Sequence, residues 1–157
     1  MQLNKAIITV GLISLNILCY LPSPALAQSI KQSSKCAATL QSVKNQITQG
    51  RRVKVVDISK DDISKDYQSY PENRPFRYLF VLRGAATESV LLSNKLLTSL
   101  SRDILTNCSD ISKVTFGLDE TDHLETFGLI SENKIDAFQC VDPGTYKKLP
   151  WGYVVCL

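Results

Sequence analysis

The residues with the clearest chemical potential form one short acidic segment around the only histidine of the chain. Four carboxylates, Asp119, Glu120, Asp122 and Glu125, surround His123. Carboxylates and an imidazole are ligands that divalent cations accept. However, alternation along a strand would divide these side chains between two faces, and the segment lacks the glycine that calcium loops use. We therefore expect a solvated turn here, without a metal ion and without a catalytic residue.

Motifs of the common enzyme classes are missing from the sequence. We find no G-x-S-x-G elbow, P-loop, Rossmann glycine pattern or H-E-x-x-H. The 15 acidic residues make some close pair of carboxylates inevitable, so such a pair would not identify a glycosidase. A small hydrolase that takes its acid or base from residues 119–125 is the alternative to a protein without enzymatic activity. No cofactor is expected.

Basic residues near two early predicted strands could form a binding face. The group comprises Arg51, Arg52, Lys54, Arg74, Arg77 and Arg83. Such a face would suit an anionic polysaccharide or a lipid headgroup. The alternative is that Arg77 and Arg83 form ion pairs with Asp57 or Asp61 across the sheet.

Aromatic residues near the C-terminal end of the sequence are a second candidate binding site. Trp151 and Tyr153 flank Gly152, and Pro150 precedes them. An exposed tryptophan in such a turn can serve as a platform for sugar. The alternative, which we expect, is that Trp151 folds back over the core close to Cys156 and is mostly buried.

The N-terminal residues are typical of a signal peptide. Lys5 precedes an apolar run at residues 6–21, and Ala25-Leu26-Ala27 then forms an A-x-A cleavage site. A spanning helix needs about 20 apolar residues, so this run is short for a membrane anchor. We expect residues 1–27 to be removed and residues 28–157 to form one secreted or periplasmic domain without a membrane span. The net charge of +3 is too small to indicate binding to nucleic acid.

Hydrophobic periodicity predicts an α+β domain. Apolar residues spaced three or four apart predict helices at residues 36–47 and 94–108. Alternating or β-branched segments predict strands at residues 53–58, 76–83, 113–118, 124–131, 134–141 and 153–156. This order is typical of an antiparallel sheet of about five strands with two helices on one face.

The four cysteines of the expected mature chain predict two disulfides. They are Cys36, Cys108, Cys140 and Cys156, and an even number in an exported protein indicates that all are paired. If the chain reverses direction at each link, Cys36 and Cys108 lie at the same end of the helix layer. Cys140 then lies at the opposite end, where the C-terminal segment can bring Cys156 back to it. We therefore predict Cys36–Cys108 and Cys140–Cys156.

Several short motifs occur in the second half of the chain. They run from F-x-L-R-G at Phe80 through S-N-K-L-L, I-L-T-N-C and V-T-F-G to L-P-W-G-Y-x-x-C, which ends at Cys156. On these motifs, Phe116-Gly117 and the L-P-W-G segment above all, the chain resembles a family of small exported proteins of cyanobacteria. Asn94 departs from the family pattern, which has proline there. The resemblance implies a source and an exported address, and it implies no activity.

Together these features favour a disulfide-stabilised protein of the cell envelope or the medium that binds a partner and catalyses no reaction. Envelope glycan or another protein would be the partner, with Trp151, Tyr153, Arg77 and Arg83 as the candidate binding residues.

Overall fold

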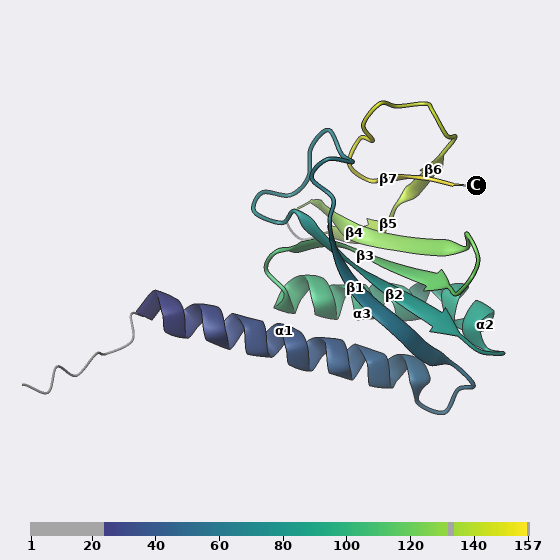
Figure 1. Ribbon diagram of the computed structural model, residues 1–157, viewed down its shortest axis with the longest axis horizontal. Helices are drawn as coiled ribbons and strands as arrows, with labels where there is room; N and C mark the ends of the chain where they lie inside the picture. The colour runs from purple at the N-terminus through teal and green to yellow at the C-terminus, as the bar shows by residue number, and fades with distance from the viewer. Residues whose placement is uncertain (1–23, 132–133, 157) are drawn as a thin grey trace, which may run out of the picture.

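The computed structural model describes residues 24–131 and 134–156. The elements are α1 (Pro24–Thr48), β1 (Lys54–Asp62), β2 (Phe76–Arg83), α2 (Thr87–Leu91), α3 (Asn94–Asn107), β3 (Ile111–Leu118), β4 (Leu124–Ser131), β5 (Lys134–Ala137), β6 (Gln139–Val141) and β7 (Tyr153–Val155). Figure 1 shows a sheet with helices packed on it and a looped C-terminal segment beside β4 and β5. The α+β class predicted from the sequence is confirmed.

The five main strands lie side by side in chain order, β1 to β5. Three of the four pairings are antiparallel, and β2 and β3 are parallel. The sheet is therefore mostly antiparallel, whereas we expected it to be antiparallel throughout. The parallel pair arises because α2 and α3 connect β2 to β3, and a helical crossover returns the chain to the end at which it began.

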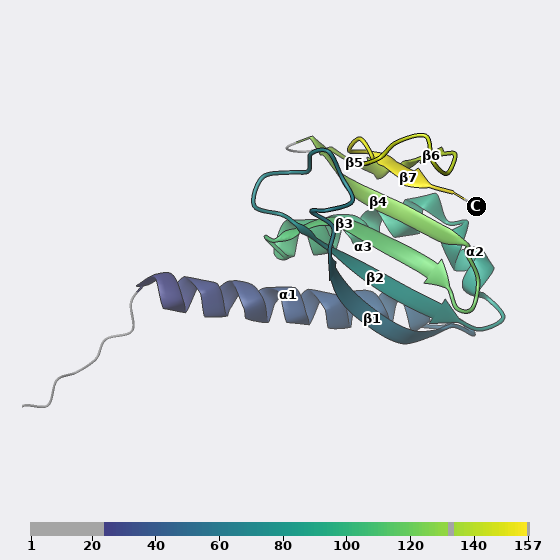
Figure 2. The ribbon, with the colours of Figure 1, turned by 45° about the horizontal axis from the view of Figure 1, so that its top comes forward.

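The main core lies between the sheet and the two long helices, which cover the same face (Figure 2). Every second residue of β2 and β3 points toward the helices, in agreement with strand alternation. The fully buried residues there are Val43 and Ile47 of α1, Leu97, Leu100 and Ile104 of α3, and Phe80, Leu82, Val114 and Phe116 of the sheet. The Phe80 and Phe116 rings stack across the parallel pair with centroids 5.4 Å apart.

Helix α1 begins at Pro24, twelve residues before the predicted start, and its first part extends past the sheet (Figure 1). The apolar stripe that predicts a helix begins only at Cys36, where α1 meets the core. No glycine or proline occurs between Ala25 and Gln49 to interrupt the helix before the stripe begins. The predicted signal peptide lies outside the described residues up to position 23, and its cleavage site after Ala27 falls within α1. No helix in residues 24–131 or 134–156 is long and apolar enough to cross a membrane.

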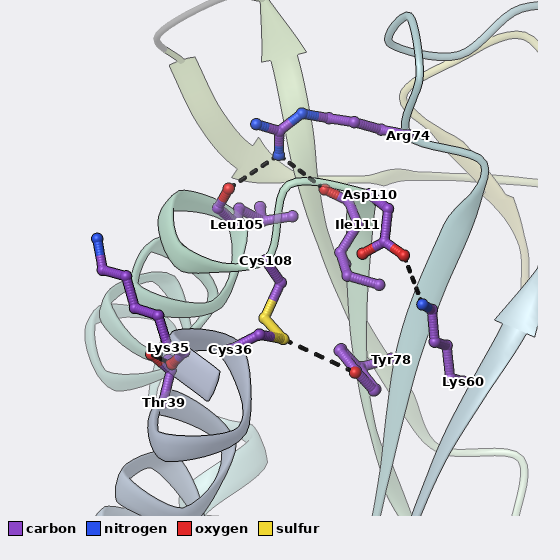
Figure 3. The surroundings of a disulfide bond; sticks show 10 residues. All are labelled: Lys35, Cys36, Thr39, Lys60, Arg74, Tyr78, Leu105, Cys108, Asp110 and Ile111. Atoms are coloured by element: carbon purple, nitrogen blue, oxygen red, sulfur yellow. Dashed lines mark hydrogen bonds and ion pairs between the residues drawn. A yellow bond between two sulfur atoms is a disulfide. The ribbon is translucent and has the colours of Figure 1, made fainter. Parts of the chain in front are cut away.

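The first predicted disulfide, Cys36–Cys108, is confirmed and joins α1 to the end of α3 (Figure 3). Its Cα atoms are 4.8 Å apart. Cys36 Sγ also lies 3.8 Å from Tyr78 Oη, so the disulfide rests against the sheet. Because the chain direction alternates from α1 through β1 and β2 to α3, the two cysteines come to the same end of the helix layer.

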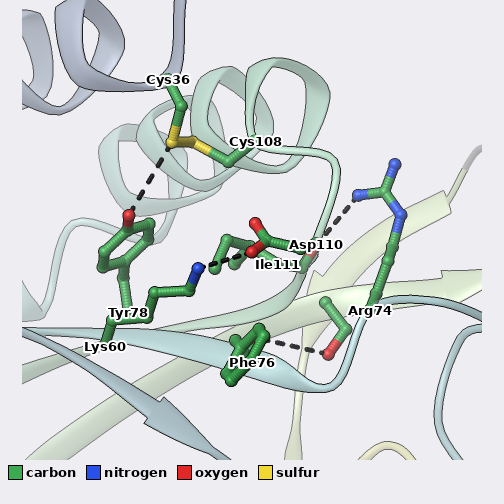
Figure 4. Close-up of polar contacts among 9 residues, drawn as sticks. Cys36, Lys60, Arg74, Phe76, Tyr78, Cys108, Asp110 and Ile111 are labelled. Atoms are coloured by element: carbon green, nitrogen blue, oxygen red, sulfur yellow. Dashed lines mark hydrogen bonds and ion pairs between the residues drawn. A yellow bond between two sulfur atoms is a disulfide. The ribbon is translucent and has the colours of Figure 1, made fainter. Parts of the chain in front are cut away.

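Polar contacts next to this disulfide hold the end of α3 against the sheet (Figure 4). Arg74 Nη1 donates to the carbonyl oxygens of Leu105 and Ile111 over 2.8 and 2.9 Å. Lys60 Nζ forms an ion pair with Asp110 Oδ2 over 2.5 Å. Arg74 thus satisfies a carbonyl at the C-terminal end of a helix, where cations are favoured.

Candidate functional site

The sheet face opposite the long helices is covered by two segments, residues 63–68 and 138–156, which we call the cover. The cover has its own small core, built from Ile63, Tyr67, Phe138, Leu149, Trp151 and Val154. The rings of Tyr67, Phe138 and Trp151 meet edge to face, with centroids 5.0 to 6.2 Å apart. A distinct aromatic cluster therefore packs on the second face of the sheet.

Backbone hydrogen bonds join the two segments of the cover. Gln68 N donates to Leu149 O over 2.8 Å, and Leu149 N donates to Asp66 O over 2.9 Å. The second predicted disulfide, Cys140–Cys156, is also confirmed and joins the ends of the C-terminal loop beside the parallel β6–β7 pair. The single strand expected at residues 134–141 is in fact two, β5 and β6. The chain leaves the main sheet at Phe138, whose ring packs on Gly128.

A pocket of about 610 Å³ opens between the cover and the sheet. The sheet contributes Arg77, Lys113, Thr115, Leu124 and Thr126, the β3–β4 turn contributes residues 121–123, and the cover contributes Asp66, Tyr67, Leu149, Val154, Val155 and Cys156. Its volume is within the range of sites that hold small organic ligands, about 300–1,000 Å³. The walls combine apolar side chains of Leu124, Leu149, Val154 and Val155 with a larger number of polar and charged groups.

Lys113 is the most unusual residue of this pocket. It is only 4% exposed, and its Nζ donates a hydrogen bond to Tyr67 Oη over 2.8 Å. The same nitrogen lies 4.6 Å from the centre of the Tyr67 ring and 5.8 Å from that of Phe138. Among the described residues, no ion pair includes Lys113, although lysines are rarely buried without a carboxylate partner.

The surroundings change the ionisation of both partners. Burial, followed by the positive charge of Arg77, lowers the pKa of Lys113 from 10.5 to about 7, and the negative charges of Asp66 and Asp61 oppose this shift. Burial raises the pKa of the Tyr67 hydroxyl, and Asp66 adds to the effect. At neutral pH the tyrosine keeps its proton, and a substantial fraction of Lys113 is an uncharged amine.

The predicted basic residues do not act as one group. Arg77 lines the pocket, and its Nε forms an ion pair with Asp61 Oδ2 over 3.0 Å, as the alternative interpretation expected. Arg83 pairs with Asp119 and with Glu120, at 3.4 Å from the latter, and not with Asp57 or Asp61. Arg83 does not line the pocket, so the structure brings only Arg77 of this pair to it.

The acidic segment forms the turn between β3 and β4, at the rim of the pocket. His123 lines the pocket, and its Nε2 lies 3.6 Å from Glu125 Oε1. Asp119 forms its ion pair with Arg83 instead. Within residues 24–131 and 134–156, no three acidic, histidine or cysteine side chains lie close enough to hold a metal ion.

Trp151 packs on the small core of the cover and is partly exposed. Its Nε1 donates to Leu129 O over 2.8 Å, and the indole is half-buried against Tyr67 and Phe138. It also borders a second hollow of about 450 Å³ with Tyr70 and Glu72. The backbone oxygen of Tyr153 accepts a hydrogen bond from Tyr67 Oη over 3.1 Å. A role for Trp151 and Tyr153 in binding sugar stays a prediction.

Sequence reasoning missed the two central residues of the pocket, Lys113 and Tyr67. A lysine near the start of a strand is usually solvated, and Tyr67 lies in a polar stretch between two predicted strands, where the sequence predicts no helix or strand. The one available signal was the alternation of β3, which places Lys113, Thr115 and Gly117 on the face away from the helices.

Comparisons with known proteins add no further constraint on this site. No model of a known family, no curated protein and no solved structure matches the chain. The resemblance to exported cyanobacterial proteins therefore stays a prediction, and the function must be argued from the geometry of the pocket.

Proposed function

We propose that this chain is an exported binding protein, without enzymatic activity, that holds a small organic molecule in the pocket between the cover and the sheet. The observation that carries the proposal is Lys113, a buried amine that lines an open pocket and has no carboxylate partner among the described residues. A buried polar group of this kind is costly unless something compensates for it. A ligand with an oxygen acceptor would supply that compensation.

Other residues that line the pocket indicate which further groups a ligand would carry. Leu124, Leu149 and Val154 offer apolar contact. The hydroxyls of Thr115 and Thr126 lie 3.1 Å apart and bond to each other. These walls suit a molecule with a short apolar body and one oxygen-bearing end.

The alternative, a small hydrolase, would use His123 as its base. His123 does line the pocket, which is the observation in favour of this alternative. A hydrolase also needs an activated nucleophile or an activated water next to that base. The described residues that line the pocket include no serine and no free thiol, because Cys156 is in a disulfide. The hydroxyls of Thr115 and Thr126 bond to each other, that of Thr121 donates to Leu118 O, and Lys113 donates to Tyr67, so none of these groups is paired with the His123 ring. Binding therefore accounts for the pocket with fewer requirements.

Ligand-observed NMR tests the proposal. The full chain, purified with both disulfides intact, is screened against short-chain carboxylates, aldehydes, phenols and monosaccharides. Val155→Trp fills the pocket from β7, and Val56→Trp is the matched control, because each valine is 44% exposed and Val56 does not line the pocket. We expect probes that bind the wild type to lose binding in Val155→Trp and to keep it in Val56→Trp. Equal binding to both variants, or no binding by any class, would contradict the proposal.

Export has a separate test. Mass spectrometry of the protein from its native source should find Gln28 as the first residue, because Ala25-Leu26-Ala27 is an A-x-A site. A mature pool that retains Met1 would show that the leader is not removed.

A further inference from the structure

We propose that Lys113 binds carbonyl compounds covalently and reversibly, as an imine between its amine and the carbonyl carbon of an aldehyde or ketone. The inference rests on the proposed function, because it uses the same pocket and names the class of ligand.

The position of the amine supports this chemistry. Lys113 lines the pocket, and one N–H group of its Nζ is donated to Tyr67 Oη, 2.8 Å away. Tyr67 is itself fixed, because its hydroxyl donates to Tyr153 O. With one N–H held in this way, the lone pair of the uncharged amine is available to a ligand in the pocket. Tyr67 is thus a positioning residue for the nitrogen.

The protonation state also fits. At pH 7 a lysine with a pKa of about 7 is half uncharged. An ordinary lysine is then almost entirely charged, and the uncharged fractions differ on the order of a thousandfold. Buried lysines with lowered pKa values are the ones that form Schiff bases with carbonyl substrates.

The reaction balances without an oxidant or a reductant. The nitrogen lone pair attacks the carbonyl carbon, and a proton moves from nitrogen to the carbonyl oxygen to give a carbinolamine. The hydroxyl group then leaves as water with a proton from solvent, the C=N bond forms, and the nitrogen loses its remaining proton. Hydrolysis reverses the sequence and releases the carbonyl compound.

Other lysines provide internal controls. Lys134 Nζ is paired with Asp136 Oδ2 at 2.9 Å, and Lys60 Nζ is paired with Asp110. Both side chains are more exposed than Lys113, so simple access to a reagent would favour them. Preferential reaction at Lys113 would therefore report its chemistry and not its exposure.

The experiment uses butanal with cyanoborohydride, which reduces an imine to a stable secondary amine. The full chain is treated briefly at pH 7, and peptide mass spectrometry measures butylation at each lysine. We expect Lys113 to be labelled at least about tenfold faster than Lys134. Val155→Trp should slow the labelling of Lys113 and leave that of Lys134 unchanged, and Val56→Trp should change neither.

The outcomes separate this inference from the proposed function. If Lys113 is labelled no faster than Lys134 while Val155→Trp still abolishes non-covalent binding of probes, the covalent inference is wrong and the binding pocket stands. If Lys113 is labelled preferentially at the same rate in Val155→Trp, and no probe binds non-covalently, the amine is reactive but the pocket is not a ligand site.

Discussion

Lys113 Nζ and Tyr67 Oη lie 2.8 Å apart although 46 positions separate the residues in the chain. Lys113 belongs to β3 in the middle of the sheet, and Tyr67 belongs to the cover. The contact therefore forms only when residues 63–68 dock on the second face of the sheet, where Leu149 bonds to them. The same docking forms one wall of the pocket, so the lysine is buried by the segment that makes it part of a site.

Stability should depend on pH through Lys113. Its pKa in the folded protein, about 7, is below the ordinary value of 10.5, so the unfolded chain binds more protons between these two values. The free energy of unfolding that Lys113 contributes must then rise with pH in this window. Below pH 7 both states are protonated, and the cost of burying the charge is fully present.

The measurement is urea unfolding of the wild type and Lys113→Met at pH 6 and pH 9. We expect the wild type to gain about 2 kcal/mol relative to the variant between these pH values. Arg77, Asp66, Asp61 and Tyr67, which also face this site, are present in both proteins, and so is His123. If the difference in unfolding free energy between the wild type and Lys113→Met does not change with pH, Lys113 is not buried as described.

The two disulfides should have different effects when they are removed. Cys36–Cys108 closes a long loop, with a sequence separation of 72, and lies away from the pocket. The double variant Cys36→Ala/Cys108→Ala should lose about 4 kcal/mol in unfolding free energy in the chain-entropy model. It should still bind the probes that occupy the pocket, as measured by NMR in the absence of denaturant.

Removal of Cys140–Cys156 should instead affect binding. Its sequence separation is 16, so its loss should cost about 3 kcal/mol. Cys156 lines the pocket, and the disulfide anchors the C-terminal segment that carries Val154 and Val155. Cys140→Ala/Cys156→Ala should therefore weaken probe binding at least about tenfold, since binding would have to order this segment. Equal probe affinities in the two double variants would contradict this role for the cover.

Gly128 should tolerate no side chain, because the Phe138 ring occupies the space. A Cβ atom at this position would lie 2.2 Å from Cε1 of Phe138. Gly128→Ala should cost about 1–3 kcal/mol in unfolding free energy, the usual range for overpacking. Gly117→Ala is the control, because the one close contact of its Cβ would be the tip of the exposed Leu124 side chain, at 2.7 Å, which can move aside. In thermal unfolding, Gly128→Ala should have a much lower melting temperature than Gly117→Ala. The reverse order would show that Phe138 packs elsewhere.

The sequence was sufficient for the two long helices where they meet the core and for the disulfides, but it did not predict the short α2, whose Val90 and Leu91 are also buried in the core. Regular apolar spacing identified the part of α1 that meets the core, and alternation identified β2 with its observed bounds. The pairing of Cys36 with Cys108 followed from the direction of successive elements. These features depend on periodicity and chain reversal, which are local properties.

The cover could not be predicted in the same way. Its contacts join Tyr67 to Leu149 and Trp151 to Leu129, and no local sequence pattern predicts these contacts. The break at Phe138 is a tertiary effect, because the chain leaves the sheet where that ring packs over Gly128. Since the candidate site lies beneath the cover, its central lysine was missed along with it.

The ionisation of Lys113 tests the central claim most directly. NMR of the Cε and Nζ signals of the lysines follows the charge of each amine as pH is raised, and Lys113→Arg identifies the signal of Lys113 by its loss. We predict that this one signal titrates near pH 7, because burial and Arg77 disfavour the charged form. Titration of Lys113 near about 10.4, the ordinary pKa of a lysine side chain, would contradict the account of this pocket.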